Sequence, residues 1–202
     1  MSRQLTWSVV ADGGTDRLLV PIIQWAIHRL DPVVEILEPE FRKRHGSVVD
    51  FLGAYESRVM LVFVHRDSEN VSLQRRLREF KAVTRPSVVP VVPVQMSEAW
   101  ILFDGAAVAK AAGSPSSRVP VPAIGDIEGI SNPKERLDDL LFRAAGSPTG
   151  RRGRNFKRSI VDRRVSVAEY ISDYDPLRRL PAFRRFQESL AEQYPYTGLP
   201  GR

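Results

Sequence analysis

Six consecutive apolar residues, Val59 to Val64, constrain the fold of this chain more than any other feature. A strand that is apolar at every position must be covered on both faces, which is typical of parallel sheets flanked by helices. Two further apolar runs, residues 5–10 and 87–94, predict more strands, and Pro90 and Pro93 place the second of these near an edge or a bulge. The chain is therefore predicted to be an α/β protein with a mainly parallel sheet, its helices covering residues 16–30, 68–83 and 97–112.

The order of these patterns divides the chain into two parts. Residues 1–112 are expected to form the α/β core, and residues 113–202 a loop-rich, helical extension packed on it. The other expectations are a strand at 33–37, helix or loop at 41–54, loops at 113–129 and 146–153, a helix with a capped start at 131–135, helices at 165–170 and 181–193, and a frayed tail at 194–202.

Composition restricts the chemistry. The 202 residues include no cysteine, which excludes disulfides and thiolate metal sites, and only three scattered histidines. Any bound metal should therefore be a hard cation held by carboxylates, Mg²⁺ or Mn²⁺. The first residues lack the pattern of a signal peptide, and no apolar run approaches the roughly 20 residues that span a bilayer. We therefore expect a soluble, cytoplasmic protein.

The first predicted strand runs directly into Asp12-Gly13-Gly14-Thr15-Asp16, and a helical pattern follows. Two glycines allow a sharp turn and a close approach to a ligand, and Thr15 or Asp16 is placed to cap the helix. Open α/β sheets place their chemistry at such strand ends. The alternative is an ordinary strand-to-helix turn without a function.

The other two apolar strands also run into acids. Asp67 and Glu69 follow the second strand, and Glu98 follows the third. If the strands are parallel neighbours, these carboxylates converge with Asp12 at one edge of the sheet, where their mutual repulsion requires a cation or shared protons. The alternative is that Asp67, Glu69 and Glu98 are solvated acids at helix starts. His65 is interpreted as a local hydrogen-bonding residue, with a catalytic role beside Asp67 as the alternative.

The positive charge is unevenly placed along the chain. The formal net charge is +6, and seven arginines and lysines lie between Arg151 and Arg164 against one acid, Asp162. Such a cluster suits a polyanion, because neutralising phosphates releases counterions. The alternative is a solvated, partly flexible face. A basic cluster beside an acidic cluster suggests phosphodiester chemistry. The predicted nucleic-acid contacts are Lys134, Arg151, Arg152, Arg154, Lys157 and Arg158.

The order of these motifs resembles the Toprim domain of topoisomerases, primases and OLD-type nucleases. More narrowly, the chain is similar to the Toprim-like family called domain of unknown function 4276. The resemblance rests on the segments 11–16, 67–69, 95–104 and 132–134 and on the aromatic-rich segment 181–186. It covers most of the chain, and Glu98-Ala99-Trp100 is its most distinctive piece.

The resemblance implies a Toprim-like, Rossmann-like core and a metal-dependent nuclease, often in bacterial anti-phage defence beside an ATPase. It places Asp12 where Toprim proteins usually have a glutamate that acts as general acid/base or metal ligand. It places Asp67 and Glu69 at the acid-x-acid pair that binds Mg²⁺. This chain departs from the pattern twice, because Asp12 is one methylene shorter than glutamate and Glu69 replaces the usual second aspartate.

The leading hypothesis is a Mg²⁺- or Mn²⁺-dependent endonuclease that cleaves DNA or RNA. Its catalytic residues would be Asp12, Asp67, Glu69 and Glu98, the first three as metal ligands. The alternative is a catalytically degenerate Toprim module that binds nucleic acid or an ATPase partner, with an oligomer possible. Phosphoryl or nucleotidyl transfer is a third reading, although no tyrosine is obviously placed as a topoisomerase nucleophile.

Overall fold

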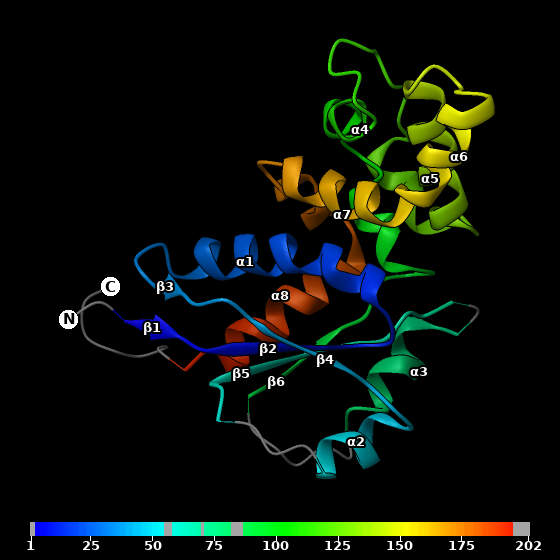
Figure 1. Cartoon of the computed structure of the whole chain (residues 1–202). Coiled ribbons are helices and arrows are strands. Elements are labelled where there is room, and N and C mark those ends of the chain that lie inside the picture. Colours follow the sequence, from blue (N-terminus) through cyan, green and yellow to red (C-terminus); the bar gives the residue numbers. More distant parts are fainter. Residues whose placement is uncertain (1–2, 55–57, 70, 82–86, 196–202) are drawn as a thin grey trace.

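The computed structural model describes residues 3–54, 58–69, 71–81 and 87–195 (Figure 1). Its strands are β1 (Gln4–Leu5), β2 (Trp7–Ala11), β3 (Glu35–Ile36), β4 (Glu40–Lys43), β5 (Leu61–His65) and β6 (Val88–Val91). The α-helices are α1 (Leu19–Leu30), α2 (Val48–Ala54), α3 (Leu73–Arg78), α4 (Gly105–Ala111), α5 (Pro133–Ala144), α6 (Gly150–Arg158), α7 (Ile160–Tyr170) and α8 (Pro181–Gln193). Short 3₁₀ helices are η1 (Gly14–Leu18), η2 (Ser97–Ile101), η3 (Ile124–Gly129) and η4 (Asp175–Arg179).

Four strands form one parallel sheet in the order β4-β2-β5-β6, and β1 and β3 form a separate parallel pair. The prediction of an α/β protein with a parallel sheet is confirmed. The strand that contains Pro90 lies at an edge, as expected from its missing N–H donor. Every residue of β2 and β5 is buried, since helices cover both faces.

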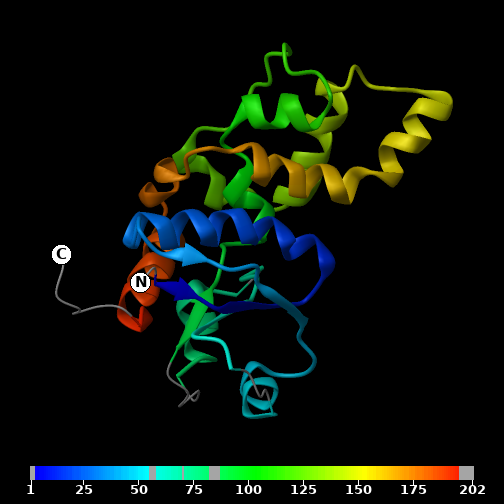
Figure 2. The ribbon, with the colours of Figure 1, turned by 60° about the vertical axis from the view of Figure 1, so that its left-hand side comes forward.

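Side chains alternate between the two faces of the sheet. In β5, Leu61 and Phe63 join the larger hydrophobic cluster, with α1 and α8, whereas Val62 and Val64 join the smaller one, with α2 and the α3 region. Figures 1 and 2 show α1 and α8 on one face of the sheet and α2 and α3 on the other. The sheet is therefore the middle layer of three.

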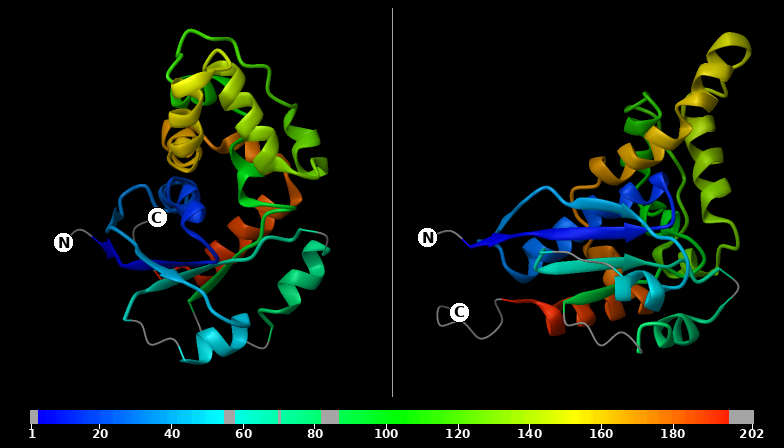
Figure 3. Two further views of the ribbon diagram at one scale, coloured as in Figure 1. Left: turned by 45° about the vertical axis from the view of Figure 1, so that its right-hand side comes forward. Right: turned by 60° about the horizontal axis from the view of Figure 1, so that its bottom comes forward.

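Helices α4 to α7 form a further layer beyond α1, with α6 at its outer end (Figure 3). Helix α7 packs against η1 and α4, and α8 packs against β6, so residues after 112 contact the core in several places. Trp100 of η2 makes an edge-to-face contact with Phe183 of α8, with ring centroids 5.1 Å apart. One hydrophobic cluster therefore includes residues from both parts of the chain.

Several local predictions are wrong, for physical reasons. Residues 40–43 form a strand beside β2, where helix or loop was expected, because an edge strand needs no apolar run. The strand predicted at 33–37 shrinks to the two residues of β3. The loop predicted at 146–153 ends early because α6 starts at Gly150 and buries Phe156.

Two helical predictions hold only in part. The pattern at 97–112 is divided into η2 and α4, because the Asp104 side chain accepts a hydrogen bond from the Ala107 N–H and starts a new helix. Within residues 68–83, the helix is Leu73–Arg78, and residues 70, 82 and 83 lie outside the described residues.

The predicted frayed tail begins with an ordered residue. Tyr194 is buried and donates a hydrogen bond to Asp31 at 2.9 Å, whereas residues 196–202 lie outside the described part of the chain. None of the helices described is long and apolar enough to cross a membrane.

Candidate functional site

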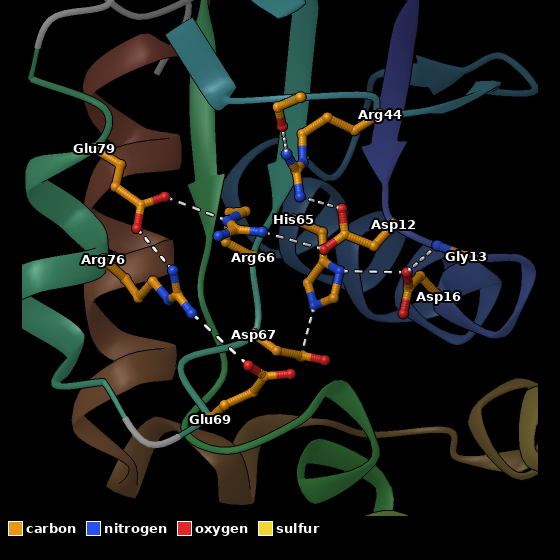
Figure 4. Close-up of polar contacts among 11 residues, drawn as sticks. Asp12, Gly13, Asp16, Arg44, His65, Arg66, Asp67, Glu69, Arg76 and Glu79 are labelled. Atoms are coloured by element: carbon orange, nitrogen blue, oxygen red, sulfur yellow. Dashed lines mark hydrogen bonds and ion pairs between the residues drawn. The ribbon is translucent and has the colours of Figure 1, made fainter.

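A buried histidine lies at the carboxyl end of the central strands. His65 is the last residue of β5, is 1% exposed, and lies between two aspartates (Figure 4). Its Nε2 is 2.9 Å from Oδ1 of Asp67, within hydrogen-bond distance. Its Nδ1 is 3.4 Å from Oδ2 of Asp16, an ion-pair contact without hydrogen-bond geometry. The imidazole therefore bridges two carboxylates.

The turn after β2 positions Asp16. The Asp16 carboxylate accepts a hydrogen bond from the Gly13 N–H at 2.9 Å, which closes the turn and directs the side chain inward. Its other oxygen is 3.4 Å from the hydroxyl of Ser97, at the start of η2. The turn thus connects the end of β2 to the segment that follows β6.

The electrostatics of this cluster favour a charged imidazole. Burial works to lower the pKa of His65, but the adjacent carboxylates of Asp16 and Asp67 outweigh it and raise the pKa to about 10. Burial works to raise the pKa of Asp16, but His65, the Gly13 N–H and Ser97 outweigh it and lower the pKa. At neutral pH the centre of the cluster is therefore an imidazolium held between carboxylates.

Glu98 completes the cluster from the segment after β6. It is 4% exposed, and one of its oxygens is 3.4 Å from the Ser97 hydroxyl. Burial, together with the negative charge of Asp67, raises the pKa of Glu98, although Lys134 and Arg164 act in the opposite direction. This carboxyl group therefore keeps its proton to a higher pH than an ordinary glutamate.

Two of the predicted ligands lie in a different set of contacts. Asp12 forms ion pairs with Arg44 and Arg66. Glu69 is exposed, has a φ of 50°, and has an oxygen 3.8 Å from Arg76. Figure 4 shows these pairs as one alternating row of arginines and acids, in which Glu79 joins Arg66 to Arg76. We call this row the arginine chain: Arg44, Asp12, Arg66, Glu79, Arg76 and Glu69.

The parallel order of β2, β5 and β6 brings the predicted acids to one edge of the sheet, where they divide between two sets. Asp67 and Glu98 belong to the His65 cluster, whereas Asp12 and Glu69 belong to the arginine chain. Across the described residues, no group of three or more His, Asp or Glu is arranged to hold a metal ion. The set Asp12, Asp67 and Glu69 does not fit one ion as arranged, because guanidinium groups already neutralise its first and third members.

The predicted nucleic-acid contacts lie on two different helices, α5 and α6. Lys134 is exposed at the start of α5, and its charge acts on Glu98. The other predicted contacts lie on α6, at the outer end of the helical layer in Figure 3, and all five are exposed: Arg151, Arg152, Arg154, Lys157 and Arg158.

Three residues at this edge of the sheet make more contacts than the sequence predicts: Asp16, His65 and Arg44. The sequence predicts Asp16 as a helix cap and His65 as a local hydrogen-bonding residue, with a catalytic role beside Asp67 as the alternative for His65, and it predicts no role for Arg44. The sequence does mark His65, because it is the last residue of a buried strand and stands two residues before Asp67. Arg44 follows β4, a strand that the sequence did not predict.

Comparison with known proteins adds no identity. No protein-family model, curated protein or solved structure matches this chain. Proposals about its function therefore rest on the geometry of the site and on the sequence motifs.

Proposed function

We propose that this chain is a Toprim-like nuclease that hydrolyses phosphodiester bonds of DNA or RNA. The observation that carries the proposal is the convergence of Asp67 and Glu98 with His65 and Asp16 at the carboxyl edge of a parallel sheet. This edge is where open α/β sheets bind ligands. The exposed Lys134 lies near enough to influence Glu98, and the basic α6 offers further phosphate contacts.

The cluster supplies the two proton transfers that hydrolysis needs. Asp67 is 26% exposed at its side chain, and His65 orients it, so Asp67 is placed to take a proton from an attacking water. As the oxygen of that water bonds to phosphorus, the bond to the leaving oxygen breaks. Glu98 is suited to donate a proton to that oxygen, because its pKa is raised. The products are a phosphomonoester and a free hydroxyl.

Dependence on Mg²⁺ or Mn²⁺ stays a prediction from the sequence. The three predicted ligands do not form one donor set in the described residues. The Toprim resemblance extends the proposal to bacterial anti-phage defence beside an ATPase.

Replacing Asp67 with asparagine should reduce cleavage by at least about 100-fold, because an amide cannot accept the proton. The amide oxygen still accepts a hydrogen bond from His65, so the fold should be retained, which thermal melting checks. The measurement is cleavage of end-labelled single- and double-stranded DNA and RNA, with Mg²⁺, with Mn²⁺ and with excess chelator. Asp139→Asn, an acid on α5 that pairs with Arg143, is the control. Full activity in the Asp67 variant would contradict the assignment.

A second candidate function is favoured by the arginine chain. Asp12 and Glu69 already have cationic partners. In this second candidate, the chain is therefore a catalytically degenerate module that binds nucleic acid or an ATPase partner and does not cleave nucleic acid. Binding of nucleic acid without cleavage under every metal condition, in a correctly folded protein, would support this candidate over the nuclease.

Both candidates use α6 as a phosphate-binding element. Replacing Arg151 and Arg154 with alanine should weaken binding to all nucleic-acid sequences alike and reduce the slope of log affinity against log salt by about 2, roughly one per phosphate contact. Fluorescence anisotropy over a salt series measures both effects. The control is the charge-matched double variant Arg143→Ala/Arg185→Ala, which removes arginines already paired with Asp139 and Glu188. Equal losses in the two variants would show that only net charge matters.

A further inference from the structure

Asp12 lies between two arginines that come from neighbouring strands. In the sheet order β4-β2-β5, Arg44 follows β4, Asp12 follows β2 and Arg66 follows β5. The Arg44 guanidinium pairs with one oxygen of Asp12, and the Arg66 guanidinium lies 3.4 Å from the other. Each cation therefore contacts a different oxygen of the same carboxylate (Figure 4).

Other partners fix both guanidinium groups in place. Arg44 is only 9% exposed at its side chain, and it also donates to the Gly46 carbonyl oxygen. Arg66 is 21% exposed, and its Nε donates to Glu79 at 3.3 Å. Asp12 itself is 45% exposed, so it is the most accessible member of the trio. Its carboxylate can turn away into water while the guanidiniums stay where they are.

The turn that follows Asp12 is not crowded. A Cβ atom added at Gly13 or at Gly14 would meet no atom within 4 Å, so open space adjoins the turn beside Asp12. Two guanidiniums directed at one position form a geometry that suits the oxygens of a phosphoryl group, which accept paired N–H donors.

We propose that Arg44 and Arg66 form a binding site for a phosphoryl group, and that Asp12 occupies this site as an internal substitute in the free protein. An incoming phosphate displaces the Asp12 carboxylate and takes its two guanidinium partners. The inference rests on the proposed function for its biological ligand, a nucleic-acid phosphate. In this proposal Asp12 competes with the phosphate for the two guanidiniums, and it does not act as a metal ligand.

The test measures the affinity for pyrophosphate and for single-stranded DNA with either a 5′-phosphate or a 5′-hydroxyl, at low salt. Asp12→Asn should bind each phosphoryl ligand of this site about tenfold more tightly than the unaltered chain, which corresponds to about 1.4 kcal/mol. Arg44→Gln and Arg66→Gln should each lose at least about tenfold in the Asp12→Asn background. Thermal melting of each variant separates lost binding from lost folding.

The matched control is Asp175→Asn. Asp175 is 49% exposed at its side chain and pairs with Arg178 at 3.2 Å, so this variant makes the same change of charge at a similar ion pair elsewhere. Tighter binding only to the 5′-phosphorylated strand would identify the ligand as a terminal phosphate, and tighter binding to both strands would identify a backbone phosphate. Equal affinities for Asp12→Asn and Asp175→Asn would overturn the proposal. Because pyrophosphate contains no phosphodiester bond, the result with this ligand is independent of nuclease activity.

Discussion

The variant His65→Leu should lose about 3–5 kcal/mol of unfolding free energy at pH 7, the typical cost of removing one partner from a buried ion pair. Leucine fills most of the space but leaves Asp16 buried, and Asp67 partly so, without the cation that His65 supplies. Urea unfolding followed by circular dichroism measures the loss. His28→Leu, which replaces an exposed histidine of α1, is the control.

The pH dependence of stability tests the same cluster. Folding raises the pKa of His65 from its ordinary 6.5 to about 10. Between these two pH values, the native chain therefore keeps a proton on His65 that the unfolded chain has already released. Its contribution to stability is complete below pH 6.5 and is lost as the pH rises toward 10. The urea midpoint should therefore fall between pH 7.5 and 9.5, and the fall should be much smaller in His65→Leu. Parallel curves for the two proteins would show that His65 is neutral in the native state.

The second large effect is expected at the contact between the last helix and the core. Phe183→Ala should lose about 3–5 kcal/mol of unfolding free energy, as is typical for a large aromatic side chain removed from a core. Phe183 is fully buried, and its ring packs edge-to-face on Trp100 and on Phe186, with centroids 5.1 Å and 5.6 Å apart. Chemical unfolding measures the loss.

Two companion variants show whether that loss arises from packing. Phe183→Leu keeps much of the apolar volume and should lose less than half as much. Val161→Ala removes an exposed side chain from α7 and should change stability by less than about 0.5 kcal/mol. A small loss in Phe183→Ala would mean that α8 contributes little to holding the sheet.

Strong local patterns made the sheet predictable. The apolar run at 59–64 and the alternation of strands with helices led to the correct fold class, and Pro181–Gln193 forms a helix with the predicted bounds. The failures occur where tertiary contacts outweigh local signals. Strand β4 has the sequence Glu40-Phe41-Arg42-Lys43, whose mainly polar side chains an edge strand tolerates. Its own sequence does not predict a strand, and the pairing with β2 makes it one.

The site was predictable in its location more than in its contacts. Parallel strands bring Asp12, Asp67 and Glu98 to one edge, as their positions after apolar runs indicated. The sequence alone does not show which side of the edge each carboxylate faces or which cation reaches it first. Arg44 reaches Asp12 from the neighbouring strand β4, so that pairing depends on the strand order. His65 and Asp67 lie two residues apart at the end of β5, so their contact is local, and the sequence spacing alone did not show that it forms.

The position of α8 against β6 has a consequence for synthesis on the ribosome. Roughly 90 residues separate the end of β6 from the start of α8, which takes about 5–20 s to translate at common rates. During that interval the side of the sheet that contains Phe63 lacks Phe186, its aromatic neighbour from the last helix. The nascent chain therefore exposes apolar surface for seconds, which makes it a substrate for chaperones that bind such surfaces.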